Sequence, residues 1–269
     1  EYKFVSTNPC QPKWATILTP NGIRTLDEIN VGDTIWSSEG WTTILQKEYS
    51  GIKEVNEYRT TAGSFIGTDT HKIISNNEKI EVKDADFIDV LAGNEPEFLS
   101  LCNQDVIDGL VIGDGSVHKV SNNLVYLCIG DNDGDYLLSE IQPLIKEYRP
   151  GIKSCAFEID TTITYKELPQ TFLREIPERF IKGTSSTVCG FLRGLYSANG
   201  SVVNNRVTLK TTSPILRDTV QLMLSSVGIR SYYTTNKETE TTFSNGIYTC
   251  KESYDINIST DRGIFYRNI

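Results

Sequence analysis

The stretch IDGLVIGDG at residues 107–115 decides the fold, because a similar stretch, LRGLYSANG, returns at residues 192–200. In each stretch apolar residues surround a central glycine, Gly109 or Gly194, and the end is an acidic or amide residue followed by glycine. The second stretch follows after about 85 residues, which is the length of a whole supersecondary unit. We interpret the pair as two copies of one structural unit.

The sequence after each stretch supports this repeat. Strand pairs are predicted around residues 117–129 and 202–209, and amphipathic helices over residues 135–148 and 214–227. The shared order of helix, hairpin and helix predicts a pseudo-twofold α/β domain, for which we set the bounds 97–253.

The residues on both sides of this domain are predicted to be β structure. Residues 10–96 form short alternating segments between turn signals such as Pro-Asn-Gly at 20–22 and Val-Gly-Asp at 31–33. Residues 254–269 return to alternation. We therefore expect a mostly β unit built from both ends of the chain, with the α/β domain inserted in it.

Composition narrows the class of protein. The chain has 269 residues, 38% hydrophobic and 23% charged, as in an ordinary globular protein. Its net charge of −9 argues against a dedicated nucleic-acid binder. It has no apolar run long enough for a membrane span, and residues 1–9 lack the apolar core of a signal peptide. The six cysteines include no C-x-x-C pair. We expect a cytoplasmic monomer without a membrane partner.

Three ordered motifs carry a family resemblance. The pattern C-x5-TILT-x2-G-x2-TL-x2-I-x2-GD at residues 10–33 resembles the first motif of the intein (Hint) family. Thr-Asp-Thr-His at 68–71 resembles its Thr-x-x-His motif, and residues 253–258 with 264–268 resemble its penultimate C-terminal block. A lone cysteine is usually inert and a lone histidine is usually solvated, so the interpretation rests on the order of the motifs.

This resemblance implies a Hint horseshoe formed from both ends of the chain. Residues 1–9 would be the N-terminal host segment, or extein. Residues 10–96 would be the N-terminal part of the splicing domain, and residues 254–269 an incomplete C-terminal part. Ser-Thr-Asn-Pro at 6–9 resembles the active-site region of ribonucleotide reductase large subunits, so we expect such a host. The exteins are then the expected partners.

By the same resemblance, splicing starts with an N-to-S acyl shift at the bond between Pro9 and Cys10. The Cys10 thiol attacks the Pro9 carbonyl, and no cofactor is needed. A twist of about 12° in the amide stores only about 1 kcal/mol, so general acid catalysis is required. His71 would protonate the departing amide nitrogen. Thr68 would polarise the carbonyl or orient the imidazole, and Asp255 would modulate the thiol.

The sequence departs from the family at two places. Pro9 makes the chain before the nucleophile rigid. Family members end in Asn followed by a host Cys, Ser or Thr, whereas here Asn268 and Ile269 come last and Gly263 stands at the place of the block's histidine. We expect a thioester but not complete splicing. A disordered end, a truncation, and a split intein with a short C-terminal fragment as partner all remain open.

The repeated stretches resemble the paired LAGLIDADG helices of homing endonucleases. In that family each helix presents one carboxylate to divalent metal ions at its penultimate motif position, where this chain has Asp114 and Asn199. Asp114 would hold Mg²⁺ only if the nuclease were retained. Because an amide is neutral, we expect nuclease activity to be lost. Gly109 and Gly194 would let the two helices approach closely.

Charge supports a degenerate endonuclease. Residues 97–253 hold 15 Lys and Arg against 18 Asp and Glu, and the strands that would read DNA carry only Lys119, Arg206 and Lys210 besides His118. DNA is therefore expected to be a weak partner. Two alternatives stay open: an active or DNA-binding LAGLIDADG endonuclease that cuts an intein-less host allele, and a non-catalytic binding module.

Overall fold

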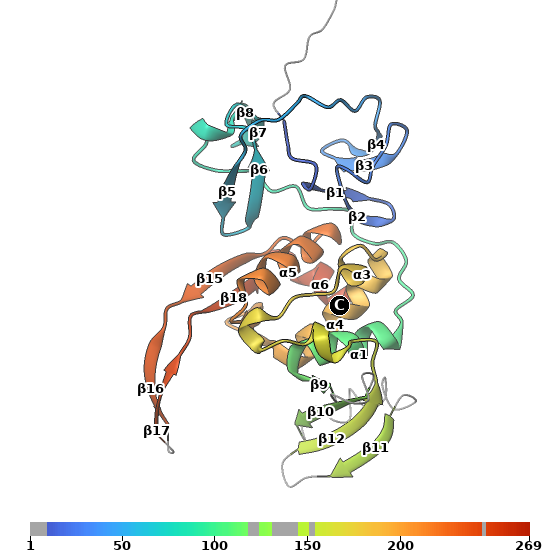
Figure 1. Cartoon of the computed structure of the whole chain (residues 1–269), viewed down its shortest axis with the longest axis vertical. Coiled ribbons are helices and arrows are strands. Elements are labelled where there is room, and N and C mark those ends of the chain that lie inside the picture. Colours follow the sequence, from blue (N-terminus) through green and yellow to red (C-terminus); the bar gives the residue numbers. More distant parts are fainter. Residues whose placement is uncertain (1–9, 118–123, 131–144, 151–153, 244–245) are drawn as a thin grey trace, which may run out of the picture.

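The computed structural model describes residues 10–117, 124–130, 145–150, 154–243 and 246–269. Figure 1 shows three layers along the long axis: β-hairpins formed by residues 10–81 at the top, a cluster of helices in the middle, and a small sheet at the bottom. A long hairpin projects to one side. None of the helices in the described ranges is long and apolar enough to cross a membrane.

The upper part consists of four two-stranded antiparallel sheets. Their strands are β1 (Thr16–Thr19), β2 (Gly22–Thr25), β3 (Thr34–Ser37), β4 (Gly40–Thr43), β5 (Asn56–Thr60), β6 (Gly63–Gly67), β7 (Lys72–Ser75) and β8 (Glu78–Glu81), followed by a short 3-10 helix, η1 (Val82–Asp84). The turn between β7 and β8 uses Asn76 and Asn77, both with positive φ, as a tight two-residue hairpin requires. The predicted β character is thus observed over residues 16–81, whereas residues 82–96 contain no strand.

The middle and lower parts hold the α/β domain. Its elements form two successive runs. The first run consists of α1 (Asn103–Asp114), β9 (Ser116–Val117), β10 (Leu124–Gly130), β11 (Ile145–Pro150) and β12 (Ser154–Asp160). The second run consists of η3 (Tyr165–Glu167), η4 (Thr171–Leu173), α3 (Glu178–Ile181), α4 (Ser185–Asn199), β13 (Gly200–Val203), β14 (Arg206–Thr211), α5 (Pro214–Ser226), β15 (Tyr232–Asn236), β16 (Thr239–Phe243), β17 (Gly246–Cys250), β18 (Ser253–Ile258) and α6 (Arg262–Asn268). The two sheets have the strand orders β11-β12-β10-β9 and β13-β14-β18-β15. All their pairs are antiparallel.

The two repeated stretches form α1 and α4, which pack against each other through glycine. A Cβ added to Gly109 would lie 2.0 Å from the carbonyl oxygen of Phe191, and one added to Gly194 would lie 1.8 Å from that of Val106. The two contacts are symmetric, since each glycine meets the carbonyl three residues before the other glycine. No side chain fits there, so the predicted packing role of both glycines is observed.

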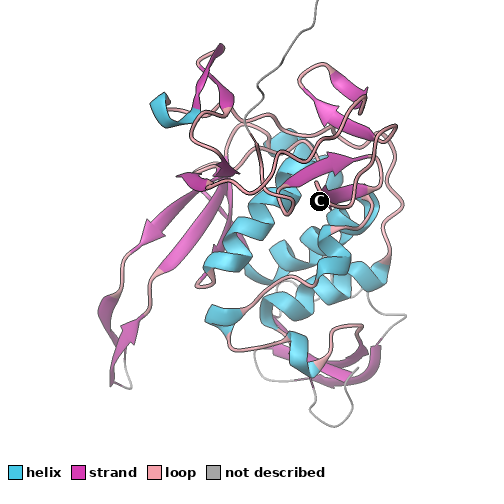
Figure 2. Cartoon of the chain, turned by 45° about the horizontal axis from the view of Figure 1, so that its top comes forward, coloured by secondary structure: helices cyan, strands magenta, loops and turns pink. Residues whose placement is uncertain are grey.

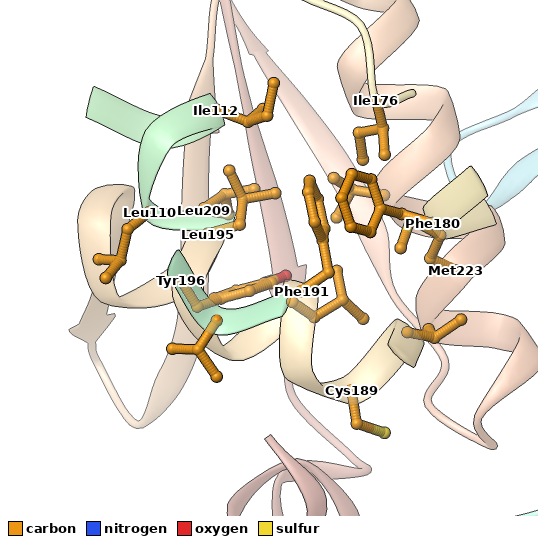
Figure 3. Close-up of a cluster of buried hydrophobic side chains, with 14 of the residues drawn as sticks. Leu110, Ile112, Ile176, Phe180, Cys189, Phe191, Leu195, Tyr196, Leu209 and Met223 are labelled. Atoms are coloured by element: carbon orange, nitrogen blue, oxygen red, sulfur yellow. The ribbon is translucent and has the colours of Figure 1, made fainter. Parts of the chain in front are cut away.

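Apolar side chains from both runs form one core around this helix pair. Figure 3 shows Phe191 of α4 beside Phe180, with Leu195 of α4 and Leu209 of β14 on the other side of the Phe191 ring. Phe191, Leu195 and Leu209 are fully buried, and the rings of Phe180 and Phe191 are 4.5 Å apart. Burying a large apolar side chain contributes about 1.5–3 kcal/mol, so this shared core is the main source of the domain's stability.

The last strand corrects the predicted domain boundary at residue 253. β18 pairs with β14 on one side and β15 on the other, in a central position of the second sheet. Ile256 and Ile258 are fully buried in the α/β core. Residues 254–269 therefore complete the second run of the α/β domain and are not part of the β unit at the N-terminal end. A period-two pattern shows that a segment is a strand but not which sheet it joins.

Two further expectations about secondary structure are wrong. Residues 262–268, expected as β structure, form helix α6, whose Phe265 packs on Tyr196 with ring centroids 4.8 Å apart. Residues 145–148, expected at the end of a helix, belong to strand β11, which pairs with β12. In both places tertiary contacts override the local pattern. The rest of that expected helix, residues 135–144, lies outside the described residues.

Two contacts join the lower face of the β unit to the helices of the α/β domain. At one, Arg24 donates to the carbonyl oxygen of Lys182 at 2.9 Å, and the Lys182 ammonium pairs with Glu28 at 2.5 Å. At the other, the Gly93 amide donates to the carbonyl oxygen of Ser225, at the end of α5. Figure 2 shows the hairpins lying directly over these helices. The interface includes backbone groups, so its geometry is tightly defined.

A third contact joins the tip of the β5–β6 hairpin to α5 and β15. The carbonyl oxygen of Thr61 accepts from the Tyr233 amide at 2.8 Å and from the Gln221 side chain at 3.0 Å. Beside it, Arg59 pairs with Asp218 at 2.9 Å. The α/β domain thus holds the hairpin that leads, through β6, to the segment at residues 68–71.

Candidate functional site

Cys10 and Thr68 are bound to each other through two hydrogen bonds. The Cys10 amide donates to the Thr68 hydroxyl at 3.2 Å, and the Thr68 amide donates to the Cys10 carbonyl oxygen at 3.0 Å. Both residues are half-buried. The Cys10 backbone, including the nitrogen of the predicted scissile bond, is therefore fixed on both sides by one residue. Pro9 lies outside the described residues.

His71 lies at the other end of the same turn. Its amide donates to the carbonyl oxygen of Thr68 at 2.8 Å, and its own carbonyl accepts from Val82 at 2.7 Å. Its ring packs on Phe65, with centroids 4.8 Å apart. The turn thus holds the imidazole against β6, the strand that leads into Thr68.

Asp69, which directly follows Thr68, anchors this turn to β5. Its carboxylate accepts from the Tyr58 hydroxyl at 2.5 Å and from the Asn56 side chain at 2.6 Å. These hydrogen bonds lower the pKa of Asp69, so the anchor is charged at neutral pH. We therefore assign Asp69 the role of holding the geometry of the Thr-x-x-His segment.

The Cys10 thiol has a pKa below its ordinary value. The first cause is a hydrogen bond from the Ser50 side chain, and Lys53 adds a hydrogen bond and a positive charge, while partial burial acts in the opposite direction. The Lys53 amine lies 3.3 Å from the Cys10 sulfur. Sequence reasoning missed both residues, because they belong to no motif.

The structure does not bring Asp255 into this site, which corrects its predicted role. Asp255 lies on β18, with Lys210 and Thr234 as its cross-strand partners. Its carboxylate accepts from the Asn236 side chain at 2.9 Å. Asp255 therefore belongs to the α/β sheet, and its motif-like sequence context follows from the alternation of that strand.

Large apolar side chains are exposed around the segment that carries Ser50 and Lys53. Leu45, Tyr49 and Ile52 are 87%, 85% and 97% exposed. Other exposed apolar residues of the β unit include Trp14, Val31, Trp41, Phe87 and Leu91. Single exposed apolar residues are common on protein surfaces, whereas a contiguous exposed apolar patch is typical of a binding surface.

The predicted metal position lies at the ends of α1 and α4. Asp114 is exposed at the last position of α1, and Asn199 is half-buried at the last position of α4. The Asn199 side-chain amide donates to the carbonyl oxygen of Gly113 at 3.0 Å. Asn199 thus links the two helices through its NH₂ group, which a carboxylate does not have.

A guanidinium lies at the same helix end. Arg174 donates to the carbonyl oxygens of Gly113, at 2.9 Å, and Ile112, and also reaches that of Gly115. Burial lowers the pKa of Arg174 and the nearby charge of Asp114 raises it, and the group stays protonated at neutral pH. Sequence reasoning missed this residue, since only the fold brings it to α1.

These residues do not fit a divalent-metal centre. Mg²⁺ needs oxygen ligands and negative charge, and the pair provides one carboxylate, beside which Arg174 already supplies positive charge. Within the described part of the chain, no three His, Cys, Asp or Glu side chains cluster as a metal site would need. The residues at these two helix ends therefore do not support a metal-dependent step.

Asp108, on the other side of α1, has a structural role. Its buried carboxylate accepts from the hydroxyls of Thr161 and Thr162, both at 2.5 Å, and from the Thr162 amide at 2.9 Å. It therefore fixes the chain just after β12 to the helix pair. Asp108 and Asp114 are separated by more than one helical turn of about 3.6 residues along α1.

The strands predicted to read DNA carry little free positive charge. Arg206 on β14 is half-buried and donates to the Tyr232 hydroxyl at 3.2 Å, and Lys210 lies directly opposite Asp255. Lys119 and His118 lie outside the described residues. The weak DNA affinity expected from the composition stays a prediction.

Comparison with known proteins identifies the α/β domain alone. The family profile described as a LAGLIDADG-like domain matches residues 186–262, a range that runs through β18 and past the predicted boundary at 253. No curated protein matches the chain. The similarity to a LAGLIDADG-like domain is thus shown for residues 186–262, in the second run of the α/β domain.

Solved structures resemble the chain only distantly. I-DmoI in complex with DNA and Mn is 19% identical, with 62% of this chain and 95% of that chain covered and a TM-score of 0.37. The N-terminal LAGLIDADG domain of DUF199/WhiA is 12% identical, covering 62% and 82%, with a TM-score of 0.37. I-WcaI bound to its DNA recognition sequence is 11% identical, covering 64% and 83%, with a TM-score of 0.36.

Proposed function

We propose that this chain performs the first step of protein splicing, an N-to-S acyl shift at the bond between Pro9 and Cys10. The observation that supports it most is the pair of hydrogen bonds that join Cys10 to Thr68, with His71 in the same turn. A cysteine of purely structural use needs no such backbone clamp beside a histidine.

In the proposed step, the Cys10 sulfur bonds to the Pro9 carbonyl carbon and the bond from that carbon to the Cys10 nitrogen breaks. The thiol proton passes to solvent, and His71 supplies the proton that the departing nitrogen gains. Thr68 holds that nitrogen in place through the hydroxyl that accepts its N–H. The products are a thioester and a free amine.

The later steps of splicing need a terminal Asn and an acceptor nucleophile, and the described residues bring neither to this site. Asp255 lies in the α/β sheet, and Asn268 caps α6 and donates to Glu95 at 3.0 Å. Completion of splicing would need a C-terminal segment, bearing the family's terminal Asn, that binds the β unit. The exposed Leu45, Tyr49 and Ile52 support this, since an apolar strand would cover them.

The test is thiol-driven release of residues 1–9. The chain would be incubated with dithiothreitol at neutral pH, and its mass followed. We expect release from the parent chain and from Cys102→Ser, which removes an exposed thiol outside the site. We expect none from Cys10→Ala and strongly reduced release from His71→Ala. The proposal fails if the folded parent chain keeps residues 1–9.

A host of the ribonucleotide reductase class, with residues 1–9 as its N-terminal extein, is the setting that we propose. Splicing by this route needs no cofactor, and the exteins are the partners. A synthetic C-terminal segment of an intein ending in Asn, added in trans with a host-derived Cys after it, would test completion of the reaction by mass.

The alternative function is a LAGLIDADG homing endonuclease that cuts an intein-less host allele, or one that only binds DNA. The matched LAGLIDADG-like domain favours this class, but Asn199 and Arg174 disfavour metal-dependent cleavage. A plasmid with the uninterrupted host site, incubated with Mg²⁺ or Mn²⁺, should stay intact. A specific double-strand cut would establish the alternative.

A further inference from the structure

Lys53 reaches the Cys10 sulfur from a segment that carries no motif. It lies between β4 and β5, in a stretch without regular secondary structure, and its amine is 3.3 Å from the sulfur. Lys53 is exposed, so it could equally extend into solvent. Within the described ranges it makes no ion pair with a carboxylate. Its contact with the sulfur is therefore the interaction that positions it.

Ser50, three residues before Lys53, adds a second donor. Its side chain is hydrogen-bonded to the Cys10 sulfur, and together the two residues favour the thiolate form. The side chain of Thr68, which binds the Cys10 amide on the other side, is uncharged. Among the contacts of the described residues, the positive charge that acts on the thiol is that of Lys53.

The chemistry of the proposed step gives this arrangement a use. A free thiol has a pKa of about 8.5, so only a few per cent is thiolate at pH 7. The thiolate is the nucleophile, and a nearby ammonium increases its population. Part of the gain is lost because a less basic thiolate is a weaker nucleophile, but the balance is favourable when the thiol starts above ambient pH.

We propose that Lys53 is a catalytic residue of the acyl shift, holding Cys10 as a thiolate through direct contact with its sulfur, with Ser50 as the supporting donor. This inference rests on the proposed function. It adds an activating group on a segment that the splicing motifs do not include. It also implies that the step depends on ionic strength, because an exposed charge pair is screened by salt.

The experiment measures the thiol and the cleavage separately. The rate at which iodoacetamide alkylates Cys10, followed by peptide mass over a range of pH, reports the thiolate population without any need for splicing. Lys53→Met removes the ammonium, Lys53→Arg keeps a cation, and Lys79→Met removes one exposed charge elsewhere on the same β unit. Ser50→Ala tests the supporting donor.

For Lys53→Met we expect alkylation at pH 7 to slow by about 1.5-fold to fivefold, the range for one exposed charge pair. Dithiothreitol-driven release should slow by a similar factor at pH 7 and recover above pH 9, where the thiol ionises unaided. Lys53→Arg should stay near the parent rate and Lys79→Met should match it. In high salt the gap between Lys53→Met and parent should narrow.

Two outcomes separate this inference from the proposed function. If Lys53→Met alkylates with the parent pH profile, Lys53 does not act on the thiol, and the inference is wrong even if cleavage occurs. If the alkylation profile shifts as expected but no variant or parent releases residues 1–9, the proposed function fails and Lys53 is not catalytic.

Discussion

The side-chain amide of Asn199 donates to the carbonyl oxygen of Gly113 across the paired helix ends, at 3.0 Å. The donor belongs to the last residue of α4 and the acceptor to the next-to-last residue of α1. The residue expected to have cost the domain its nuclease activity therefore has a structural use, because the NH₂ group joins the two helices.

Asn199→Asp should destabilise the domain and should not restore nuclease activity. A carboxylate would face the Gly113 carbonyl, two acceptors without a proton between them, at a cost of about 1–3 kcal/mol at neutral pH. The loss should shrink near pH 4, where the new carboxyl takes up a proton and can donate. Urea unfolding at both pH values measures this. A variant as stable as the parent at pH 7 would show that the hydrogen bond contributes nothing.

Gly194→Ala should disrupt the helix pair. The new methyl group would lie 1.8 Å from the Val106 carbonyl oxygen, so the helices must separate, at a cost of about 3 kcal/mol. Gly263→Ala on α6 is the matched control, since its Cβ would meet only the flexible Arg267 side chain, at 3.4 Å. There alanine should be neutral or slightly stabilising. Thermal unfolding of the two variants distinguishes close packing from a general effect of removing glycine.

Asp255→Asn should leave the acyl shift unchanged. Its carboxylate accepts from Asn236 within the α/β sheet, and an amide oxygen at the same position can still accept that hydrogen bond. Release of residues 1–9 should therefore stay within about twofold of the parent, whereas His71→Ala should lose most of it. A large loss of release by Asp255→Asn with unchanged thermal stability would return Asp255 to the splicing site.

Asp261→Asn should weaken the end of the domain and flatten its acid sensitivity. The buried Asp261 carboxylate accepts from the Arg230 guanidinium twice, at 2.8 Å, and from the Arg230 amide at 2.9 Å. We expect a loss of about 2 kcal/mol at neutral pH, as for hydrogen bonds to a charged group.

The pH dependence follows from the direction of the Asp261 shift. Arg230 lowers the pKa of Asp261 below its ordinary 3.8 in the folded chain. The folded state therefore binds this proton less tightly than the unfolded state, so the stabilisation is present above about pH 4 and is lost as pH falls through the folded pKa. The unfolding free energy of the parent should therefore fall below about pH 4 in part through Asp261. The Asp261→Asn variant should lack this part of the acid-induced loss, and acid unfolding of the two chains measures the difference.

The sequence by itself determined the paired helices and their contact. Three local features predict them: the periodicity of α1 and α4, the glycine in the middle of each helix, and the spacing of the two copies. Because only glycine lets the two helices approach closely, the glycine-bearing faces must be the ones that contact each other. The β character of residues 16–81 also follows from local patterns and turn residues.

Only the tertiary structure decided the place of β18 and therefore of Asp255, because alternation identifies a strand but not which sheet it joins. The same holds for Arg174 at the end of α1 and for Lys53 at Cys10. Each brings a charge to its site from a segment distant in sequence, and no local pattern records such a contact. The use of Asn199 as a hydrogen-bond donor likewise depends on which carbonyl the fold places beside it.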